Sequence, residues 1–367
     1  MKVLWLANVP APYRVNFFNE LGKHIDLTVL FEKRTSDIRD KSWLDFEFKH
    51  FRGVFLHGKK TSVSEAMCFD VIKYIKKNIY DFIVVTDFTS PTGMLAIEYM
   101  RMRGINYWLE SDGGFAKSGV GFKESIKRHF IRGAQLYLST GKLHDEYYLK
   151  YGASKDKIVR YPFTSIENSD ILEKPISKKE KLEIRKKHDI VEEKVILTVG
   201  QFVPRKGFDL LLKACENLDD NVGVYFVGGT ATEEYWEIVN KYNLKNVHFV
   251  GFKQKADIIE YYKAADFFVL PTREDVWGLV INEAMAYGLP VITTTKCIAG
   301  TELIANGENG YIVENENVHE LTNRICELLV NESSLEEMKT KALYTARQYT
   351  LEKMVQTHLD LFCGWKA

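Results

Sequence analysis

The first half of the chain alternates short apolar runs with amphipathic segments, a pattern typical of a parallel α/β sheet. The runs expected to form strands span residues 2–7, 26–31, 81–86, 105–110, 135–140 and 157–163. Helices are expected over 62–78 and 90–104, where serine caps begin each segment, a proline lies in the first turn of the second, and Gly104 follows its end. The pattern predicts a doubly wound α/β domain.

The second half repeats this alternation after a segment of different composition. Residues 164–190 are polar and rich in lysine, so we expect a linker that runs into a solvated helix. Further strands are expected at 195–200, 222–228, 247–251, 266–271, 290–294 and 310–313. Residues 334–365 have a helical pattern that no strand follows, so the apolar side of this helix must pack on a domain that is already formed.

The length of the chain agrees with two cores. A chain of 367 residues is too long for one ordinary core and fits two domains of similar size. In open α/β sheets ligands bind beyond the carboxyl ends of the strands, so two such domains are expected to face each other across a cleft.

Composition and charge exclude several classes of protein. Fifty Lys and Arg balance fifty Asp and Glu, so no global field favours nucleic acid as a partner. Five dispersed cysteines without CxxC spacing argue against a disulfide framework or a zinc site. The first residues have the pattern of a strand rather than a signal peptide, and no apolar run reaches the roughly 18 residues that cross a bilayer. We therefore expect a cytoplasmic protein.

The segment 274–294 carries the first chemical motif, a loop and helix inside one βαβ unit. Asp275 is expected on the loop at the carboxyl edge of the sheet, where Gly278 lets the backbone approach a ligand. The amides of Gly278, Leu279 and Val280 begin the helix and suit a phosphate. Glu283, one turn further on, suits the hydroxyls of a ribose. Either acid alone fits an ordinary loop or helix start, but the flanking WGL, NEAMA and GLPVI favour a site for a ligand with phosphates and sugar hydroxyls.

A basic loop at 200–207 complements that motif. A strand ends at Gly200, the loop presents Arg205 and Lys206, and Gly207 precedes a helix that begins at Phe208. Two adjacent cations can neutralise a pyrophosphate without a metal, so neither a metal nor another cofactor is expected beside this ligand. No Asp-x-Asp motif occupies a strand-end loop. The Gly-Thr-Glu sequence at 300–302 is expected to open a short helix whose amides could hold an anion, although a plain αβ connection would look the same.

At these residues the chain resembles the retaining nucleotide-sugar glycosyltransferases of glycosyltransferase family 4, which have the GT-B fold of two Rossmann-like doubly wound domains. The resemblance spans nearly the whole chain, but the second half carries it. The paired-acid motif of the family, Glu, seven residues, Glu, corresponds to Asp275 through Glu283, and its basic loop corresponds to GQFVPRKG. The resemblance implies that Glu283 binds the ribose, Asp275 faces the donor sugar, and Lys206 with Arg205 holds the diphosphate.

The resemblance also implies a full set of donor-binding residues. The strand end at 250–253 frames the nucleobase, and Asp275, Lys206 and Arg205 are the expected catalytic residues. The donor-binding set is Gly200, Gln201, Arg205, Lys206, Phe252, Glu274, Asp275, Trp277, Gly278, Leu279, Val280 and Glu283. Two positions depart from the family pattern. Asp275 is one methylene shorter than Glu, so Glu274 could substitute for it, and Gln201 stands where many relatives carry Arg.

The resemblance assigns residues 1–168 to acceptor binding, 169–346 to a linker and the nucleotide-sugar domain, and 347–367 to a helix that packs back on the first domain. The loop 110–119 follows a strand and places Glu110 and Asp112 where they could orient acceptor hydroxyls. Arg14 either reaches the cleft as a further acceptor-binding residue or is an ordinary helix-start cation, and the second alternative is favoured.

Residues 121–133 offer a candidate membrane contact. Basic side chains alternate there with apolar ones, enough for an amphipathic helix on the inner face of an anionic membrane. The alternative, which is favoured, is a surface helix whose apolar side lies on the sheet. The residues concerned are Lys123, Lys127, Arg128 and Arg132 with Phe122, Ile126, Phe130 and Ile131.

The sequence thus predicts a metal-independent, retaining hexosyltransferase. It is expected to move a sugar from a nucleotide diphosphate donor, in first place a UDP-sugar, to a saccharide or lipid-linked saccharide in surface polysaccharide or glycolipid biosynthesis. Two alternatives remain open, a nucleotide-sugar epimerase of related fold and a non-catalytic nucleotide-sugar-binding partner.

Overall fold

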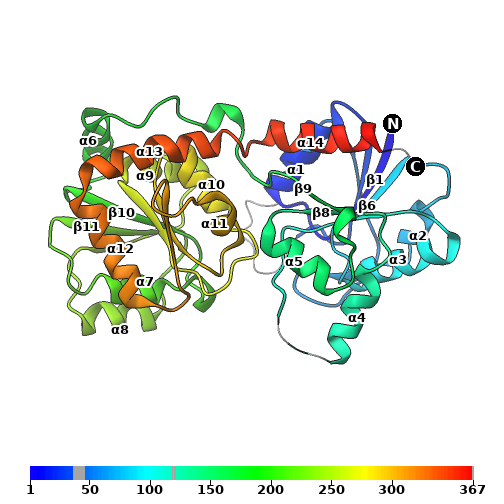
Figure 1. The fold of residues 1–367 in the computed structure, drawn as a ribbon, viewed down its shortest axis with the longest axis horizontal. Coiled ribbons are helices and arrows are strands. Elements are labelled where there is room, and N and C mark those ends of the chain that lie inside the picture. Colours follow the sequence, from blue (N-terminus) through cyan, green and yellow to red (C-terminus); the bar gives the residue numbers. More distant parts are fainter. Residues whose placement is uncertain (36–45, 118, 120, 366–367) are drawn as a thin grey trace. The chain divides into compact units, whose positions relative to one another are not determined.

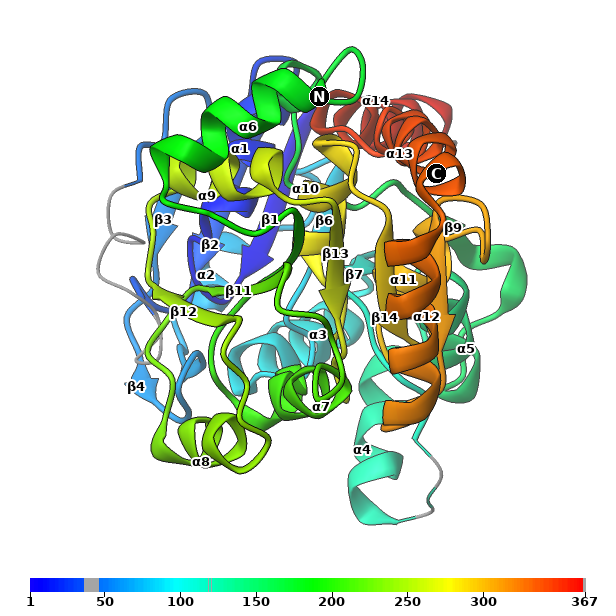
Figure 2. The same cartoon turned by 90° about the vertical axis from the view of Figure 1, so that its left-hand side faces the viewer.

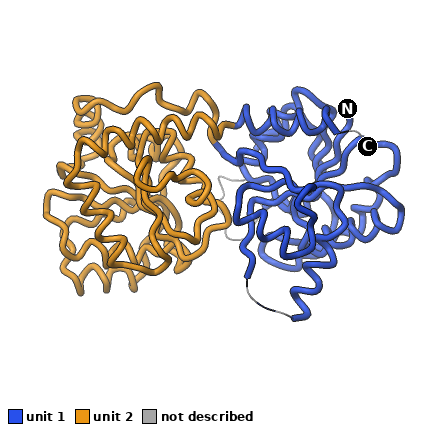
Figure 3. The backbone as a smooth tube through the Cα atoms, viewed as in Figure 1, with its two compact units in different colours: residues 1–165, 351–367 blue, residues 166–350 orange. Residues whose placement is uncertain are grey.

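The computed structural model describes residues 1–35, 46–117, 119 and 121–365 and divides the chain into two compact units (Figures 1 and 3). Unit 1 comprises Met1–Ser165 with Leu351–Ala367, and unit 2 comprises Ile166–Thr350. The divisions fall after 165 and 350, against expected boundaries after 168 and 346. Position 118 of the expected loop 110–119, and positions 366–367 of the expected terminal helix, lie outside the described residues.

Unit 1 contains a seven-stranded parallel sheet in the order β3-β2-β1-β6-β7-β8-β9. The strands are β1 (Lys2–Ala7), β2 (Asp26–Phe31), β3 (Arg52–Phe55), β6 (Phe82–Val85), β7 (Trp108–Glu110), β8 (Leu136–Ser139) and β9 (Ile158–Arg160). All six strands expected from the apolar runs are present, β1 and β2 with the expected ends and the other four with trimmed ends. Strand β3 is not predicted by its sequence because it is a short edge strand with no fully buried residue.

Helices surround this sheet. They are α1 (Pro12–Gly22), α2 (Val71–Tyr74), α3 (Pro91–Arg103), α4 (Phe122–Ile131), α5 (Lys142–Lys150) and α14 (Leu351–Gly364). Helix α3 confirms the start and stop signals, because the Ser90 side chain accepts a hydrogen bond from the Gly93 amide and Gly104 adopts a left-handed φ of 59°.

The helix expected over 62–78 is wrong for most of its length. Strand β5 (Ala66–Met67), which pairs antiparallel with β4 (Lys59–Lys60), and the single turn of α2 occupy this stretch. Backbone amides that a helix would use for its own hydrogen bonds donate instead to side chains distant in the sequence. The Ala66 amide donates to Glu32 Oε2 at 3.0 Å, and the Cys68 amide donates to Thr92 Oγ1 at 3.0 Å.

Unit 2 contains a six-stranded parallel sheet in the order β12-β11-β10-β13-β14-β15. The strands are β10 (Lys194–Val199), β11 (Val222–Val227), β12 (Val247–Gly251), β13 (Phe267–Leu270), β14 (Val291–Thr294) and β15 (Gly310–Val313), and all six were expected.

Helices cover both faces of this second sheet (Figure 2). They are α6 (Lys178–Lys187), α7 (Phe208–Ala214), α8 (Glu233–Lys241), α9 (Lys255–Ala264), α10 (Leu279–Ala286), α11 (Ile298–Leu303), α12 (Val318–Val330) and α13 (Glu332–Ala346). Helix α7 packs against α8 and α12, whereas α9 packs against α6 and α10 against α13.

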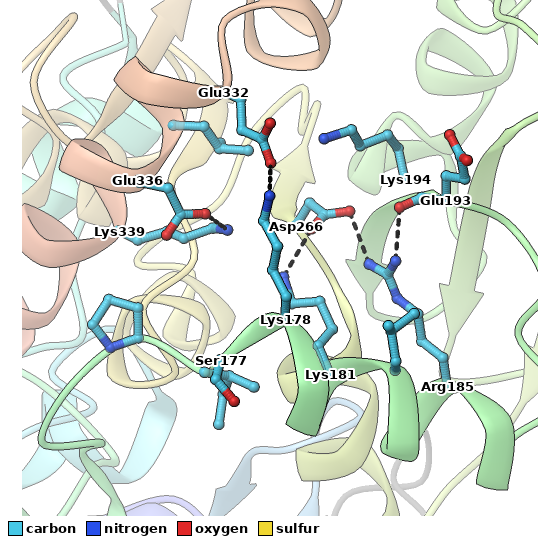
Figure 4. A pocket seen from close by; sticks show the side chains of 14 residues that line it. Ser177, Lys178, Lys181, Arg185, Glu193, Lys194, Asp266, Glu332, Glu336 and Lys339 are labelled. Atoms are coloured by element: carbon cyan, nitrogen blue, oxygen red, sulfur yellow. Dashed lines mark hydrogen bonds and ion pairs between the residues drawn. The ribbon is translucent and has the colours of Figure 1, made fainter.

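Most residues of helix α6 are exposed, as its lysine-rich sequence predicts, but two of its charged residues are not. Lys181 and Arg185 are buried, and both bind the Asp266 carboxylate just before β13 at 2.8 Å (Figure 4). Arg185 also donates to the Ala264 carbonyl. The helix is therefore anchored to the sheet by buried charges rather than by an apolar stripe, which a hydrophobicity pattern cannot reveal.

A cavity of about 620 Å³ lies beside these charges, at the amino ends of β10 and β13 (Figure 4). Ion pairs between α6 and α13 and within α13 line it, Lys178 with Glu332 at 2.6 Å and Lys339 with Glu336 at 2.6 Å. Ligands of parallel sheets bind at the opposite, carboxyl edge, so this cavity is a structural feature of the α6 anchor.

The expected helical segment 334–365 consists of two helices, α13 and α14, with a break at 347–350. Helix α14 packs against α1 and belongs to unit 1. Its buried side chains Met354, Val355 and Phe362 supply the apolar contact.

We predict that Asp266→Asn lowers the free energy of unfolding by about 3–5 kcal/mol, because two buried cations lose their counter-charge. Urea unfolding at neutral pH measures the loss. Glu332→Gln is the matched control: it removes the exposed partner of Lys178 and should cost much less. Equal losses in the two variants would contradict the anchoring role of Asp266.

Candidate functional site

Glycines line the carboxyl edge of the unit 2 sheet. Gly200 follows β10, Gly228 and Gly229 follow β11, and Gly251 ends β12. A Cβ on Gly228 would lie 2.9 Å from the Gly200 carbonyl oxygen, and the Gly228 amide donates to the Gly251 carbonyl at 2.8 Å. The edge therefore presents bare backbone that a ligand can approach closely.

The basic loop is fixed to the neighbouring loop after β13. A tight turn over Pro204–Lys206 ends at Gly207, whose φ is 66° and whose missing Cβ would lie 2.0 Å from the Pro271 carbonyl oxygen. The Arg205 carbonyl accepts a hydrogen bond from the Arg273 amide at 2.8 Å. These contacts place both basic side chains at the carboxyl edge of the sheet.

Asp275 binds both cations of that loop. Lys206 Nζ lies 2.6 Å from Asp275 Oδ2, and Arg205 Nη1 lies 3.1 Å from Oδ1. The Lys206 and Asp275 side chains are 12% and 11% exposed, whereas half of Arg205 is exposed. A diphosphate can therefore bind these cations only by sharing them with, or taking them from, the Asp275 carboxylate.

Helix α10 begins beside this ion cluster. Gly278 has a φ of 104°, and a Cβ there would lie 2.7 Å from Cys297 Sγ, so only glycine fits the turn. The Asp275 amide donates to the Lys296 carbonyl at 2.8 Å, which holds the loop in place. The first amides of a helix, here Gly278, Leu279 and Val280, have no acceptor in a preceding turn and create a positive end. This end adds to the anion-binding character of the cluster.

Glu283 lies further along α10 and is partly buried. The Tyr262 hydroxyl donates to Glu283 Oε2 at 2.9 Å and fixes the carboxylate. Burial raises the pKa of Glu283, and the Tyr262 hydrogen bond and the charges of Lys255 and Lys206 oppose that rise. The ion pairs of Lys206 and Arg205 with Asp275 show that the structure brings the two predicted motifs together.

The remaining predicted donor residues differ in exposure. Phe252 directly follows β12 with 54% of its surface exposed, and Gln201 is exposed. The Glu274 carbonyl accepts a hydrogen bond from Arg205. Trp277 is different, because it is 3% exposed and its indole Nε1 donates to Asn282 Oδ1 at 2.8 Å. The Trp277 side chain therefore supports the loop from inside unit 2 and does not face a ligand, which corrects its assignment.

The expected anion turn at 300–302 is also wrong, because α11 already begins at Ile298. The Thr301 amide donates to the Cys297 carbonyl at 3.1 Å and is not free for an anion. A Cβ on Gly300 would lie 2.3 Å from Thr293 Cγ2, so this glycine serves close packing of the helix on β14.

In unit 1 the three predicted acceptor residues form one network. The Arg14 guanidinium donates to the carboxylates of Glu110 and Asp112, and the Tyr161 hydroxyl donates to Glu110 at 2.7 Å. Burial alone would raise the pKa of Glu110, but the Arg14 charge and the interactions with His358 together outweigh it and hold the pKa at about 2. Glu110 is therefore a buried carboxylate at neutral pH.

This network changes the expected roles. Arg14 is 4% exposed and ion-paired, so it is neither an ordinary helix-start cation nor a group that contacts an acceptor. Glu110 is fully buried and cannot reach an acceptor. Asp112, with a third of its side chain exposed, is the member of this network that a ligand can reach.

Two acids that the sequence analysis missed lie at the same edge of the unit 1 sheet. Glu32 directly follows β2, and Asp87 lies two residues after β6. Burial raises the pKa of Glu32 to about 8, and burial together with the charge of Glu65 raises that of Asp87 to about 7. The charge of Asp112 also acts on Asp87. Acids that follow apolar strands are the signal used for the second half, and it would have found both.

Two general features of the described residues bear on this site. No group of three or more His, Cys, Asp or Glu side chains among them is arranged to hold a metal ion. None of their helices has the length and apolar character needed to cross a membrane.

Residues 180–344, which lie within unit 2, match the family model described as glycosyl transferases group 1. Unit 2 therefore resembles a group 1 glycosyl transferase. This span contains the whole candidate site of unit 2, including the ion cluster and α10.

Curated relatives extend this likeness. An uncharacterized glycosyltransferase of Methanocaldococcus jannaschii is 31% identical over 160 residues, 43% of this chain and 45% of that protein. The chain spans about half the length of the first curated relatives that it matches. The N,N'-diacetylbacillosaminyl-diphospho-undecaprenol alpha-1,3-N-acetylgalactosaminyltransferase of Campylobacter jejuni is 23% identical over 303 residues, 80% of each protein.

A solved structure shows the fold of the whole chain. Anabaena Alr3699/HepE, crystallised in complex with UDP, superimposes with a TM-score of 0.81 over 100% of both chains at 18% identity. The chain therefore has the GT-B fold of two Rossmann-like domains, and the predicted fold class is confirmed.

We predict that Asp275→Asn strengthens pyrophosphate binding at least about tenfold, because a charged hydrogen bond contributes roughly 1.5–3 kcal/mol and its loss frees two cations. Isothermal titration calorimetry with pyrophosphate measures the change. Glu274→Gln is the control, since this neighbouring acid offers Arg205 its backbone carbonyl. An unchanged or weaker affinity in Asp275→Asn would show that Asp275 does not compete for the cations.

A second prediction concerns pH and unit 1. Unfolded carboxyl groups lose their protons near pH 4.5, whereas Glu32 retains its proton up to about pH 8 in the folded chain. Stability should therefore fall as pH rises from about 5 to 8, by at most about 1.4 kcal/mol per pH unit for this group. Urea unfolding across this range should show that the free energy of unfolding of Glu32→Gln falls less steeply with pH than that of the parent. The exposed control Glu47→Gln should have the same slope as the parent. Identical slopes in Glu32→Gln and the parent would refute a protonated Glu32.

Proposed function

We propose that the protein is a retaining glycosyltransferase of family 4. It moves a sugar from a nucleotide diphosphate donor, in first place a UDP-sugar, to a saccharide or lipid-linked saccharide in surface polysaccharide or glycolipid biosynthesis. The observation that carries the proposal is the ion cluster of Lys206, Arg205 and Asp275 beside the start of α10 and Glu283. The group 1 family match over the same residues supports it, as do the UDP of the Anabaena complex and the lipid-linked acceptor in the name of the Campylobacter jejuni relative.

The donor would bind along the carboxyl edge of the unit 2 sheet. Its diphosphate would lie against Lys206, Arg205 and the first amides of α10, which together supply positive charge without a metal. Its ribose would donate hydroxyls to the Glu283 carboxylate, which the Tyr262 hydroxyl already orients. Exposed Phe252 and the glycine backbone beside it would contact the base.

The proposed reaction exchanges one glycosidic bond for another. The bond from the anomeric carbon to the diphosphate oxygen breaks, and its electron pair stays on the diphosphate. The acceptor hydroxyl attacks on the same face, and its proton passes to a donor phosphate oxygen, so the anomeric configuration is retained. Lys206, Arg205 and the α10 amides stabilise the charge that grows on the leaving group. Asp275, drawn off the cations by the diphosphate, would face the donor sugar without forming a covalent intermediate.

The acceptor would bind to unit 1. Asp112 offers a partly exposed carboxylate there, and the half-buried Asp87 lies at the same edge of the sheet. Peripheral contact with the inner face of the membrane is part of this proposal, because a lipid-linked acceptor lies in a bilayer. The epimerase and the non-catalytic binding partner find no support in the comparisons.

We predict that UDP raises the midpoint of thermal unfolding more than GDP or ADP does, because a ligand that binds only the folded chain stabilises it by mass action. Lys206→Ala should reduce this shift and lower turnover by about 10²–10³-fold, the usual cost of losing a preorganised charge-stabilising group. Turnover is measured as acceptor-dependent donor consumption in the presence of a chelator. A shift with none of the three nucleotides would contradict the donor class, and loss of turnover on chelation would contradict metal independence.

A further inference from the structure

A basic and apolar surface of unit 1 lies outside the site described above. Exposed apolar side chains alternate there with exposed lysines over eleven residues of sequence. Phe69, Ile72 and Ile79 are 66%, 37% and 51% exposed. We define the 69–79 patch as these three residues together with Lys73, Lys76 and Lys77, all exposed.

The short helix α2 turns this patch outward. Val71 and Ile75 are 0% and 3% exposed and pack in the core of unit 1. Val71 begins α2 and Ile75 directly follows its end, so the core holds this turn at both ends. Ile72 and Lys73 within the turn, and Lys76 just after it, are exposed. The core thus fixes the side on which the patch is displayed.

The patch carries positive charge with little acidic compensation. Residues 69–79 contain one acid, Asp70. Its carboxylate accepts a hydrogen bond from the His57 amide at 3.0 Å, and its side chain is 15% exposed. Lys59 and Lys60, both exposed, form β4 just beyond His57 and add to the charge. Exposed apolar side chains among lysines match an anionic bilayer, which takes up the apolar groups at its headgroups and attracts the cations.

Helix α4, the membrane contact that the sequence suggested, fits less well. Phe122 is 82% exposed, but Phe130 packs against the core of unit 1 and Ile131 is fully buried. The apolar side of α4 is therefore largely covered by its own domain. Figures 1 and 2 both show α2 and α4 at separate places on unit 1, so the two surfaces can be tested independently.

We propose that the 69–79 patch docks the protein on the surface of an anionic lipid bilayer, with Phe69, Ile72 and Ile79 in the headgroup region and the lysines against the lipid charges. The use of this docking rests on the lipid-linked acceptor of the proposed function. The docking itself requires neither donor nor transfer, so its failure and the failure of the proposed function are distinguishable.

The test is sedimentation of the full chain with vesicles that contain phosphatidylglycerol and with vesicles of pure phosphatidylcholine. The parent chain should bind the anionic vesicles at low salt and lose binding at high salt. The variant Phe69→Ser/Lys73→Gln/Lys76→Gln should lose at least about 25-fold in partition, because each lysine near an anionic surface contributes about 1 kcal/mol, or about fivefold. The variant Lys76→Gln/Lys77→Gln leaves every apolar side chain in place, so a folding defect is not expected. Its partition onto anionic vesicles should fall by a similar factor.

A matched control removes the same chemistry from α4. The variant Phe122→Ser/Lys123→Gln/Arg128→Gln loses one aromatic ring and two cations and should bind within about twofold of the parent, since salt-screened charges far from the docked surface contribute little. Loss of binding in this variant with retention in the patch variants would overturn the proposal. Equal binding of the parent to neutral and anionic vesicles, or no binding at low salt, would also overturn it. A further contrary result would be self-association of the parent without lipid, measured by sedimentation velocity, that the patch variants lack.

Discussion

The competition between Asp275 and a diphosphate for two cations is the constraint on which the candidate site depends. Lys206 is almost buried, and a buried ammonium needs a counter-charge, which Asp275 provides at 2.6 Å. The same carboxylate holds the more exposed Arg205. A ligand with negative oxygens can replace Asp275 as the counter-charge, and the acid is then released beside the donor sugar. One ion cluster thus explains how the chain keeps a cationic pocket stable and how it could couple donor binding to the arrangement of the reacting groups.

Local backbone geometry makes this cluster possible. Gly207 and Gly278 have positive φ values, and neither position has room for a side chain. Gly207 ends the turn that carries Lys206, and Gly278 follows the loop that carries Asp275. The backbone conformation therefore sets where these two charged residues lie. The parallel sheet then brings the loops after β10 and β13 together, because these strands are neighbours in the sheet.

Much of this site could be predicted from the sequence because strand-end loops, glycines and charges recur there at short spacing. The twelve expected strands and helix α10 carry strong local signals. Other features depend on tertiary contacts that no local pattern encodes. The anchoring of helix α6 is not apparent in the sequence because its anchors, Lys181 and Arg185, are charged. Residues 62–78 do not form the expected helix because the Ala66 and Cys68 amides donate hydrogen bonds to Glu32 and Thr92. Likewise Trp277 and Glu110 occupy motif positions, yet burial gives both of them structural roles.

The most direct test of the central claim is a calorimetric comparison of UDP affinity in two backgrounds, the parent chain and a Lys206→Ala/Arg205→Ala variant. If Asp275 acts by holding the two cations, Asp275→Asn strengthens UDP binding in the parent and leaves the affinity unchanged where both cations are absent. The same gain in both backgrounds would contradict the account, because Asp275 would then oppose the ligand by a route that does not involve Lys206 and Arg205.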